Sequence, residues 1–494
     1  MRARHFSHLS TAVLLLILLF PRAASAHVNS PDVYYDGNAG PYHLLVTIRP
    51  PAVVPGIAQI EIRVAEGDVD AISIRPMRLT GPGATLAPTA DATQRSSSDP
   101  HLYTGQLWIM SRGSWKVQVE AAGAKGKGEL GVPLPAVSTN TARMDAPLGA
   151  LLAALGAVLL MGLIGIIGAA TREAGLATGE QPSPQQRNKA LRRMTVAGIT
   201  LVLAIAGAGL WWRADARASA KLNYKLPRVK TVLAGNLLRL TLENPNAPEP
   251  TRFGTENPER LRLDDLIPDH GHLMHLFLLK MPDMTSFWHL HPDKVGESEF
   301  AVNLPLLPAG HYLIYADIVH HTGFPETQVG VIDLPALAGE PLSGDDSGGF
   351  AFVAGDNVAQ LPDGYRMVWQ RDDQPLRARQ PIWFRFRIED RQGRVVSDLE
   401  NYMGMSGHMA LVSRDGNVFA HVHPAGSVSM AAVGLAVSVE SGSDTAMNGM
   451  HHSLGFANVS FPYGFPEPGE YRLFVQIKRA GHVETGVFIA RVTE

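Results

Sequence analysis

The sequence predicts a mainly β protein built from three immunoglobulin- or cupredoxin-like β-sandwich domains and a two-helix transmembrane hairpin. Three observations support this fold class. Short segments such as HLLVTIRP and AQIEIRVAE alternate or cluster apolar residues and end near Gly or Pro, a pattern typical of strands. Two apolar runs are long enough to cross a bilayer. The last part of the chain repeats itself, and 494 residues are too many for one core.

The first domain is expected over residues 27–140, after a secretory signal at 1–26. Arg2 and Arg4 precede an apolar run, and Ala24-Ser25-Ala26 fits the cleavage pattern of signal peptides. Cleavage there makes His27 the first residue, whose α-amino group and imidazole could hold one metal ion, with His43 as a further ligand. The chain has no cysteine, so neither disulfides nor thiolate ligands are expected.

The apolar runs at 146–170 and 194–212 predict two transmembrane helices. The loop between them, 171–193, is expected to stay in the cytoplasm because it carries a cluster of basic residues: Arg172, Arg187, Lys189, Arg192 and Arg193. Both large regions then lie outside, on the periplasmic side of a bacterial inner membrane. A pair of buried core helices is the alternative. A net charge of −3 without a basic block predicts no nucleic-acid partner.

Two homologous sandwiches are expected at 215–337 and 350–494, which we call repeat 1 and repeat 2. An offset of 133 places Gly271 on Gly404, and PAGHYLIYADI matches EPGEYRLFVQI. The spacer PALAGEPLSGDDSGG has the composition of a linker. Tyr312 and Tyr471 each follow a Pro/Gly turn and resemble the tyrosine corner of immunoglobulin-like sandwiches, and Trp115 takes the same place in the first domain.

Histidines gather at matching positions of the two repeats. Asp415-Gly416 predicts a two-residue hairpin in which facing residue numbers sum to 831, so His408 faces His423. His421 lies two residues before His423 on the same face. Opposed β-carbons are about 5 Å apart, within reach of one ion. The same argument applies in repeat 1 to His275, His289 and His291.

The type of metal is predicted from a difference in residue type at aligned positions of the two repeats. His270 and His272 of repeat 1 take the places of Met403 and Met405 in repeat 2. Copper accepts both imidazole and thioether ligands, whereas zinc does not favour thioether. The expected cofactor is therefore copper. The alternative is that these histidines are hydrogen-bonded polar groups of a sheet without metal.

The stretches HLMHLFLLKMPDMTSFWHLHP and GHMALVSRDGNVFAHVHP resemble the YtkA-like and copper-resistance C-like modules of extracytoplasmic copper proteins. That resemblance implies a sandwich that holds or passes on copper, with an amino-terminal histidine ligand that maps onto His27. The order of signal peptide, sandwich, two spans and sandwich also resembles the B subunit of particulate methane and ammonia monooxygenases. In that subunit the HxH motif lies in the first domain, whereas here the HxH pairs lie in the repeats.

These features predict a membrane-anchored extracytoplasmic copper-binding protein for storage, delivery or resistance. A copper transporter or a cuproenzyme is the expected partner besides copper and the inner membrane. No nucleophile arrangement, phosphate loop or pair of catalytic carboxylates favours a hydrolase or transferase. Two alternatives stay open: a copper-dependent redox enzyme or its subunit, and a metal-free interaction or adhesion protein.

Overall fold

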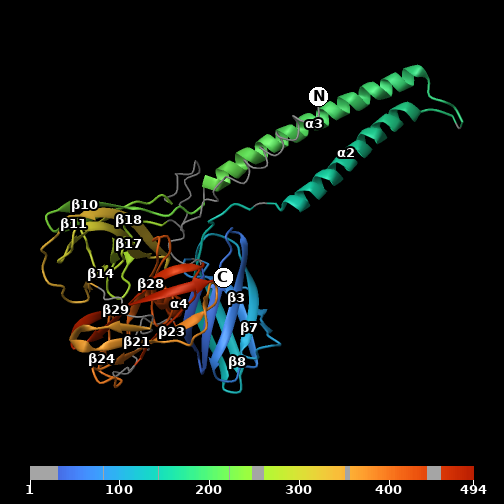
Figure 1. The fold of residues 1–494 in the computed structure, drawn as a ribbon. Helices are drawn as coiled ribbons and strands as arrows, with labels where there is room; N and C mark the ends of the chain where they lie inside the picture. The colour runs from blue at the N-terminus through green and yellow to red at the C-terminus, as the bar shows by residue number, and fades with distance from the viewer. Residues whose placement is uncertain are drawn as a thin grey trace, which may run out of the picture.

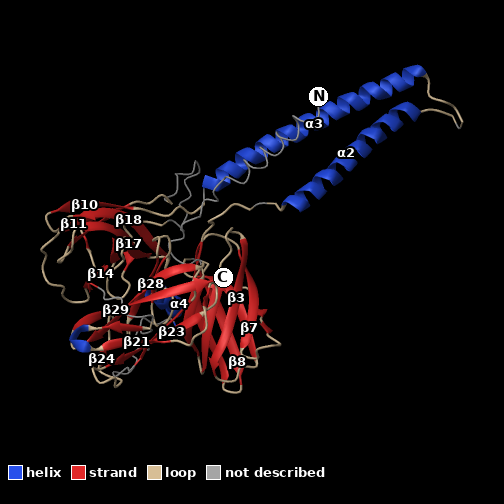
Figure 2. Ribbon diagram, viewed as in Figure 1, coloured by secondary structure: helices blue, strands red, loops and turns tan. Residues whose placement is uncertain are grey.

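The computed structural model of the chain is mainly β, as the sequence predicted, with two long helices that project from a group of β domains (Figures 1 and 2). It describes residues 32–81, 83–142, 144–177, 179–221, 223–246, 261–350, 357–441 and 458–494. The predicted signal peptide and His27 lie outside these residues.

The first domain is a sandwich of two antiparallel sheets. One sheet has the order β1-β2-β3-β7-β6 and the other β5-β4-β8-β9. Its strands are β1 (Val33–Ala39), β2 (Tyr42–Arg49), β3 (Gly56–Glu66), β4 (Ala71–Arg78), β5 (Asp91–Ala92), β6 (Gln94–Arg95), β7 (Leu102–Ile109), β8 (Gly113–Gly123) and β9 (Gly126–Ala136).

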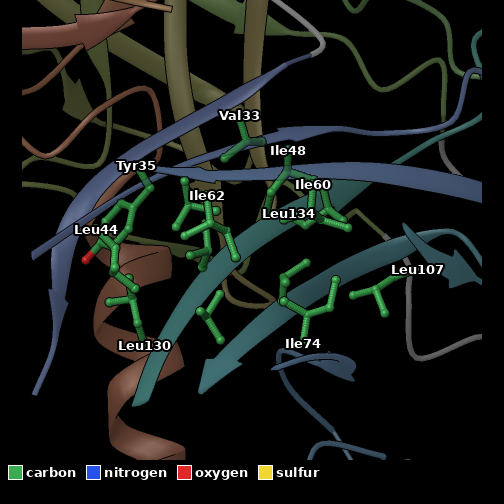
Figure 3. Packing of buried hydrophobic residues seen from close by; sticks show 14 of the residues in the cluster. Val33, Tyr35, Leu44, Ile48, Ile60, Ile62, Ile74, Leu107, Leu130 and Leu134 are labelled. Atoms are coloured by element: carbon green, nitrogen blue, oxygen red, sulfur yellow. The ribbon is translucent and has the colours of Figure 1, made fainter. Parts of the chain in front are cut away.

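Alternate apolar residues of these strands form the domain core. Ile60 and Ile62 of β3 point inward with Ile74 of β4 and Leu134 of β9, and all four are buried (Figure 3). Residues separated by two in a strand share a face, so the period-2 pattern seen in the sequence places them together. His43 of β2 pairs with Asp36 on the neighbouring strand β1.

Two helices follow the first domain, α2 (Ala146–Glu173) and α3 (Pro184–Lys221). Each is long and apolar enough to cross a membrane, and none of the residues in their apolar windows is buried. They are therefore not core helices of a globular domain. Gly168 lets the pair approach closely, since a Cβ there would lie 2.4 Å from the sulfur of Met194. α3 extends beyond the predicted 194–212 because its flanking polar residues are also helical.

Repeat 1 contains one four-stranded sheet and one larger sheet. The first has the order β10-β11-β16-β15 and the second β12-β17-β13-β14-β19, with β18 beside β17. The strands are β10 (Val229–Ala234), β11 (Leu237–Leu242), β12 (Leu266–Ile267), β13 (His275–Met281), β14 (Ser286–Leu290), β15 (Asp293–Lys294), β16 (Glu299–Asn303), β17 (Gly310–His320), β18 (Pro325–Leu334) and β19 (Ser347–Phe350).

Repeat 2 has the same plan, with sheets β20-β21-β23-β27 and β22-β29-β28-β25-β26, and β24 beside β28. The elements are β20 (Val358–Gln360), the 3-10 turn η1 (Pro362–Gly364), β21 (Arg366–Gln370), β22 (Leu376–Arg377), β23 (Ile382–Glu389), β24 (Leu399–Glu400), β25 (His408–Ser413), β26 (Phe419–Val422), α4 (Met430–Ser441), β27 (Asn458–Tyr463), β28 (Gly469–Arg479) and β29 (His482–Thr493).

The tyrosine corner, or its tryptophan equivalent, is present in all three sandwiches, as expected from the sequence. The Tyr312 hydroxyl donates to the carbonyl of Pro308 at 2.6 Å, and the Tyr471 hydroxyl to that of Glu467 at 2.8 Å. Trp115 Nε1 donates to the carbonyl of Ser111 at 2.8 Å. Each bond spans four residues, so the predicted equivalence of Trp115 with the two tyrosines is confirmed.

The spacer between the repeats differs from the predicted linker. Its last residues form β19, which pairs with β14 of repeat 1. Asp345 and Asp346, just before β19, contact histidines of that repeat. Gly348, with φ +152°, allows the close approach: a Cβ there would lie 2.3 Å from Trp288. The composition of the spacer did not reveal these tertiary contacts.

Candidate metal centre

The two repeats pack their histidine-bearing sheets against each other. Between them lies a buried cluster to which both sheets contribute, including Phe277 and Phe287 of repeat 1 and Phe419 and Phe474 of repeat 2. Phe287 stacks on Phe474 with ring centroids 4.2 Å apart, and Tyr315 stacks on Phe419 at 4.3 Å. Because Phe287 aligns with Phe419 and Tyr315 with Phe474, the two stacks are equivalent. The repeats are thus related by a pseudo-two-fold axis.

The register predicted for the histidines of repeat 2 is present, and repeat 1 has an equivalent one. Met409 pairs with Val422 and Ala410 with His421, so facing numbers sum to 831 and the predicted hairpin is confirmed. In repeat 1 Leu276 pairs with Leu290, which brings His275 opposite His291. The turns that precede β13 and β25 also match, since His270 and Met403 both have a positive φ, of 52° and 50°.

The eight repeat histidines named in the sequence analysis form one continuous cluster across the interface. Ring centroids of His275 and His421, which belong to different repeats, are 5.3 Å apart, and those of His270 and His408 are 4.9 Å apart. His272 stacks on His291 at 3.9 Å. The sequence predicted one separate site in each repeat. The structure instead gathers both sets at the shared interface.

Two groups of three imidazoles could each hold an ion. The ligand nitrogens of His275, His289 and His291 lie within 4.8 Å of one another, and so do those of the group His270, His408 and His423. Bonds of about 2.0 Å place ligands of one ion up to about 4 Å apart, so small ring movements would close either group. The first group is the predicted one. The second takes His270 from repeat 1, whereas the sequence predicted His421, which lies between the groups.

In several of these imidazoles one ring nitrogen has a hydrogen-bond partner and the other has none. Nδ1 of His291 lies 2.9 Å from Asp346, Nδ1 of His423 lies 3.1 Å from the carbonyl of Val428, and Nδ1 of His270 lies 2.9 Å from that of Met403. In each the buried Nε2 has no hydrogen-bond partner among the described residues. Such an arrangement fixes the tautomer and leaves Nε2 free for a metal.

His421 and His289, at the centre of the cluster, are each oriented by a residue of the other repeat, with pseudo-two-fold symmetry. His421 Nδ1 lies 3.4 Å from Asp317 of the other repeat, and its Nε2 is buried and unpaired. Its equivalent, His289, has Nδ1 3.0 Å from Gln476 of the other repeat, and its Nε2 lies 3.0 Å from His275. Asp317 and Gln476 occupy equivalent positions on β17 and β28. Each repeat therefore orients a histidine of its partner.

Burial favours the neutral form of the innermost histidines. Burial is the largest cause that lowers the pKa of five histidines well below the ordinary value: His275, His289, His408, His421 and His423. Neighbouring imidazoles lower the pKa of the first four further. A neutral imidazole is the form that binds metal. Burial raises the pKa of Asp317 to about 7.

Other predicted ligands take different places. His272 is 30% exposed and lies 3.5 Å from Asp345, beside the first group. The backbone carbonyl of Met403 contacts Nδ1 of His270, and Met405 pairs with Tyr402 through the backbone. Thioether ligation by these methionines stays a prediction. His27 lies outside the described residues.

Comparison with known proteins leaves the cluster without an assigned role. Residues 359–494, most of repeat 2, match a family described as a domain of unknown function, DUF8832. No curated protein matches the chain.

Solved structures give weak likenesses. A 1.5-MDa bacterial ice-binding adhesin is 6% identical with a TM-score of 0.14, covering 89% of this chain and 91% of that one. A putative membrane-anchored protein from Corynebacterium diphtheriae is 8% identical with a TM-score of 0.16, covering 94% and 96%. Salmonella alpha-2-macroglobulin is 8% identical with a TM-score of 0.18, covering 96% and 24%. Scores this low carry no argument.

The groups that position the imidazoles were not predicted from the sequence. Asp317, Asp346 and Gln476 belong to strands or a spacer with no motif of their own. A signal existed for one of them: Asp345-Asp346 is an acidic pair at the edge of a Gly-rich spacer. The repeat alignment also pairs Asp317 with Gln476, which marks two equivalent polar positions within the strands but does not show what they contact.

Proposed function

We propose that this chain is a membrane-anchored extracytoplasmic copper-binding protein in which the histidine cluster between the repeats binds two copper ions as cargo. The observation that carries the proposal is the set of buried, unpaired Nε2 atoms on His270, His291, His421 and His423. A buried polar nitrogen without a partner costs roughly 1–3 kcal/mol, and a bound ion would remove that cost.

The donor set favours copper. Six imidazoles supply the two groups, and the part of the chain that the structure describes offers neither thiolate nor a carboxylate within them. Imidazole suits both zinc and copper, but among divalent first-row metals copper has the highest affinity. The predicted thioethers, Met403 and Met405, would add affinity for Cu(I).

The two apolar helices support an anchor in the bacterial inner membrane. Basic residues flank the short loop between them, which favours a cytoplasmic loop with the sandwiches outside. Storage, delivery to a transporter or cuproenzyme, and resistance all fit a site that binds ions near a membrane. The predicted signal peptide agrees with export.

The test is metal stoichiometry in the full chain, purified in detergent and desalted after copper loading. We expect two copper ions per chain. The double variant His289→Ala/His291→Ala should bind one, and so should His408→Ala/His423→Ala, because each removes two ligands of one group. Cu(II) in the remaining group should show electron paramagnetic resonance splittings from imidazole nitrogen.

The matched control is His311→Ala/His482→Ala, which removes two exposed histidines from outside the cluster. It should still bind two ions. Retention of two ions by both cluster variants, with native circular dichroism, would show that copper binds elsewhere. No bound copper in the unsubstituted chain would end the proposal.

A further inference from the structure

A cavity of about 590 Å³ lies where the three sandwiches meet. The first domain contributes Ala52 and Asn140, repeat 1 contributes His275 and Asp317, and repeat 2 contributes His423. The cavity thus reaches a ligand of each three-histidine group. A second cavity, of about 430 Å³, is lined by residues of the first domain alone.

The cavity runs from an exposed mouth to a buried end. Ala52, Thr139 and Asn140 are exposed, whereas His275 and His423 are 2% and 3% exposed. The backbone carbonyl of Ala52 accepts from the amides of Thr139 and Asn140, each at 3.0 Å, which fixes the mouth. The same cavity is thus lined both by exposed residues of the first domain and by buried imidazoles of the cluster.

The mouth lies at the end of the molecule that carries the helices. Asn140 precedes α2 by six residues and Tyr224, another lining residue, follows α3 by three. A chain extends by at most about 3.5 Å per residue, so the mouth is within roughly 20 Å of the first turn of α2. In Figure 1 the helix pair leaves the group of β domains at this junction.

The lining of the cavity is suited to a cation. It includes four carboxylates, those of Asp32, Asp269, Asp317 and Glu326, and no lysine or arginine. Arg49 lies 3.6 Å from Asp32 and His320 lies 3.5 Å from Glu326, so these two are balanced. Asp317 has a hydroxyl donor, Thr327, and a histidine, His421, as its described partners. Carboxyl oxygens without a lysine or arginine among the lining residues favour the passage of a cation over that of an anion.

We propose that this cavity is the route by which the copper ion passes between the membrane-facing surface and the histidine cluster. The inference rests on the proposed function, since it concerns access to the same site. It implies that the ion is exchanged on the side of the protein that faces the membrane, where a membrane-embedded partner could take or supply it.

The test changes charge at the mouth without touching a ligand. Ala52→Lys and Ala52→Glu are compared with Ala124→Lys and Ala124→Glu, which carry the same changes on an exposed turn between β8 and β9. Uptake of Cu(II) from its glycine complex is followed by stopped-flow tryptophan fluorescence, using the full chain in detergent at low ionic strength.

We expect Ala52→Lys to slow uptake about threefold or more and Ala52→Glu to accelerate it, because one charge at a channel mouth changes the local cation concentration. The differences should vanish near 1 M salt, where the screening length is about 3 Å. Both variants should still bind two ions with unchanged affinity.

The outcomes separate the two proposals. If all variants load two ions and the Ala52 pair behaves like the Ala124 pair at low salt, the ion reaches the cluster by another route and the inference is overturned. If the unsubstituted chain binds no copper, the proposed function itself fails.

Discussion

At the residue scale, the candidate metal centre depends on which ring nitrogen of each imidazole has a hydrogen-bond partner and which is left for the metal. His421 and His289 are oriented by Asp317 and Gln476 across the interface, while His291 is oriented by Asp346 within repeat 1. Carboxylate partners make an imidazole a stronger ligand and fix its ring. The sequence predicted the imidazoles but not these partners, because a partner on another strand leaves no local spacing to detect.

The substitution Asp317→Asn tests this orientation. We expect copper affinity to fall about 10- to 100-fold, the usual cost of losing a carboxylate behind a ligating histidine, with two ions still bound at saturation. Competition against a chelator of known affinity measures the change. Asp333→Asn is the matched control, since Asp333 pairs with exposed His311 far from any ligand group. Equal affinities for both variants would contradict a role for Asp317 in orienting His421.

At the element scale, two duplicated hairpins form one centre by packing face to face. Phe277 of β13 contacts Phe419 of β26, with ring centroids 5.1 Å apart. Two symmetric stacks join each hairpin to the adjacent long strand of the other repeat, Phe287 to Phe474 on β28 and Phe419 to Tyr315 on β17. The same interface buries neutral histidines. Its stability should therefore depend on pH.

Acid should weaken the interface of the metal-free protein. Six cluster histidines have a lowered pKa, mainly through burial, so below about pH 6.5 the unfolded chain binds more protons than the folded one at these sites: His275, His289, His291, His408, His421 and His423. Their stabilisation is present above pH 6.5 and is lost as the pH falls toward the lowered values. Each proton difference contributes about 1.4 kcal/mol per pH unit.

Five groups act in the opposite direction, because their pKa is raised: Asp32, His43, Asp269, Asp317 and His320. The lowered groups outnumber them, so the net effect is loss of stability on acidification. Urea unfolding with a chelator present at pH 7.5, 6.5 and 5.5 measures it. The variant His421→Gln should flatten the dependence, whereas His311→Gln should not. A midpoint that rose as the pH fell would reverse the predicted sign.

At the scale of the whole molecule, the first sandwich and the helix pair frame access to the centre. Residues 425–437 of repeat 2 pack against the core of the first domain, to which Val428 and Val433 contribute. Asp269 of repeat 1 accepts from the amide of Ala431 at 2.8 Å at the start of α4. These contacts join all three domains around the cavity.

The absence of cysteine allows a clean test of sidedness. Single cysteines are introduced as Ser97→Cys in the first domain and Ser183→Cys between the helices, both at exposed positions. In intact spheroplasts a membrane-impermeant maleimide should label Ser97→Cys at once and Ser183→Cys after lysis, because the basic loop is expected inside. Labelling of Ser183→Cys before lysis would contradict the proposed orientation.

The sequence by itself determined the mainly β class, the two long apolar helices, the repeat, the corner residues and the hairpin register that sums to 831. These depend on side-chain periodicity, turn residues and length, which act between near neighbours in the chain. Only the tertiary structure decided that both sets of histidines meet at one interface and that His270 joins His408 and His423. It also assigned Asp317, Asp346 and Gln476 to the centre and placed a cavity beside it. A strand pattern fixes which residues share a face, but which two faces meet depends on packing between residues more than a hundred positions apart.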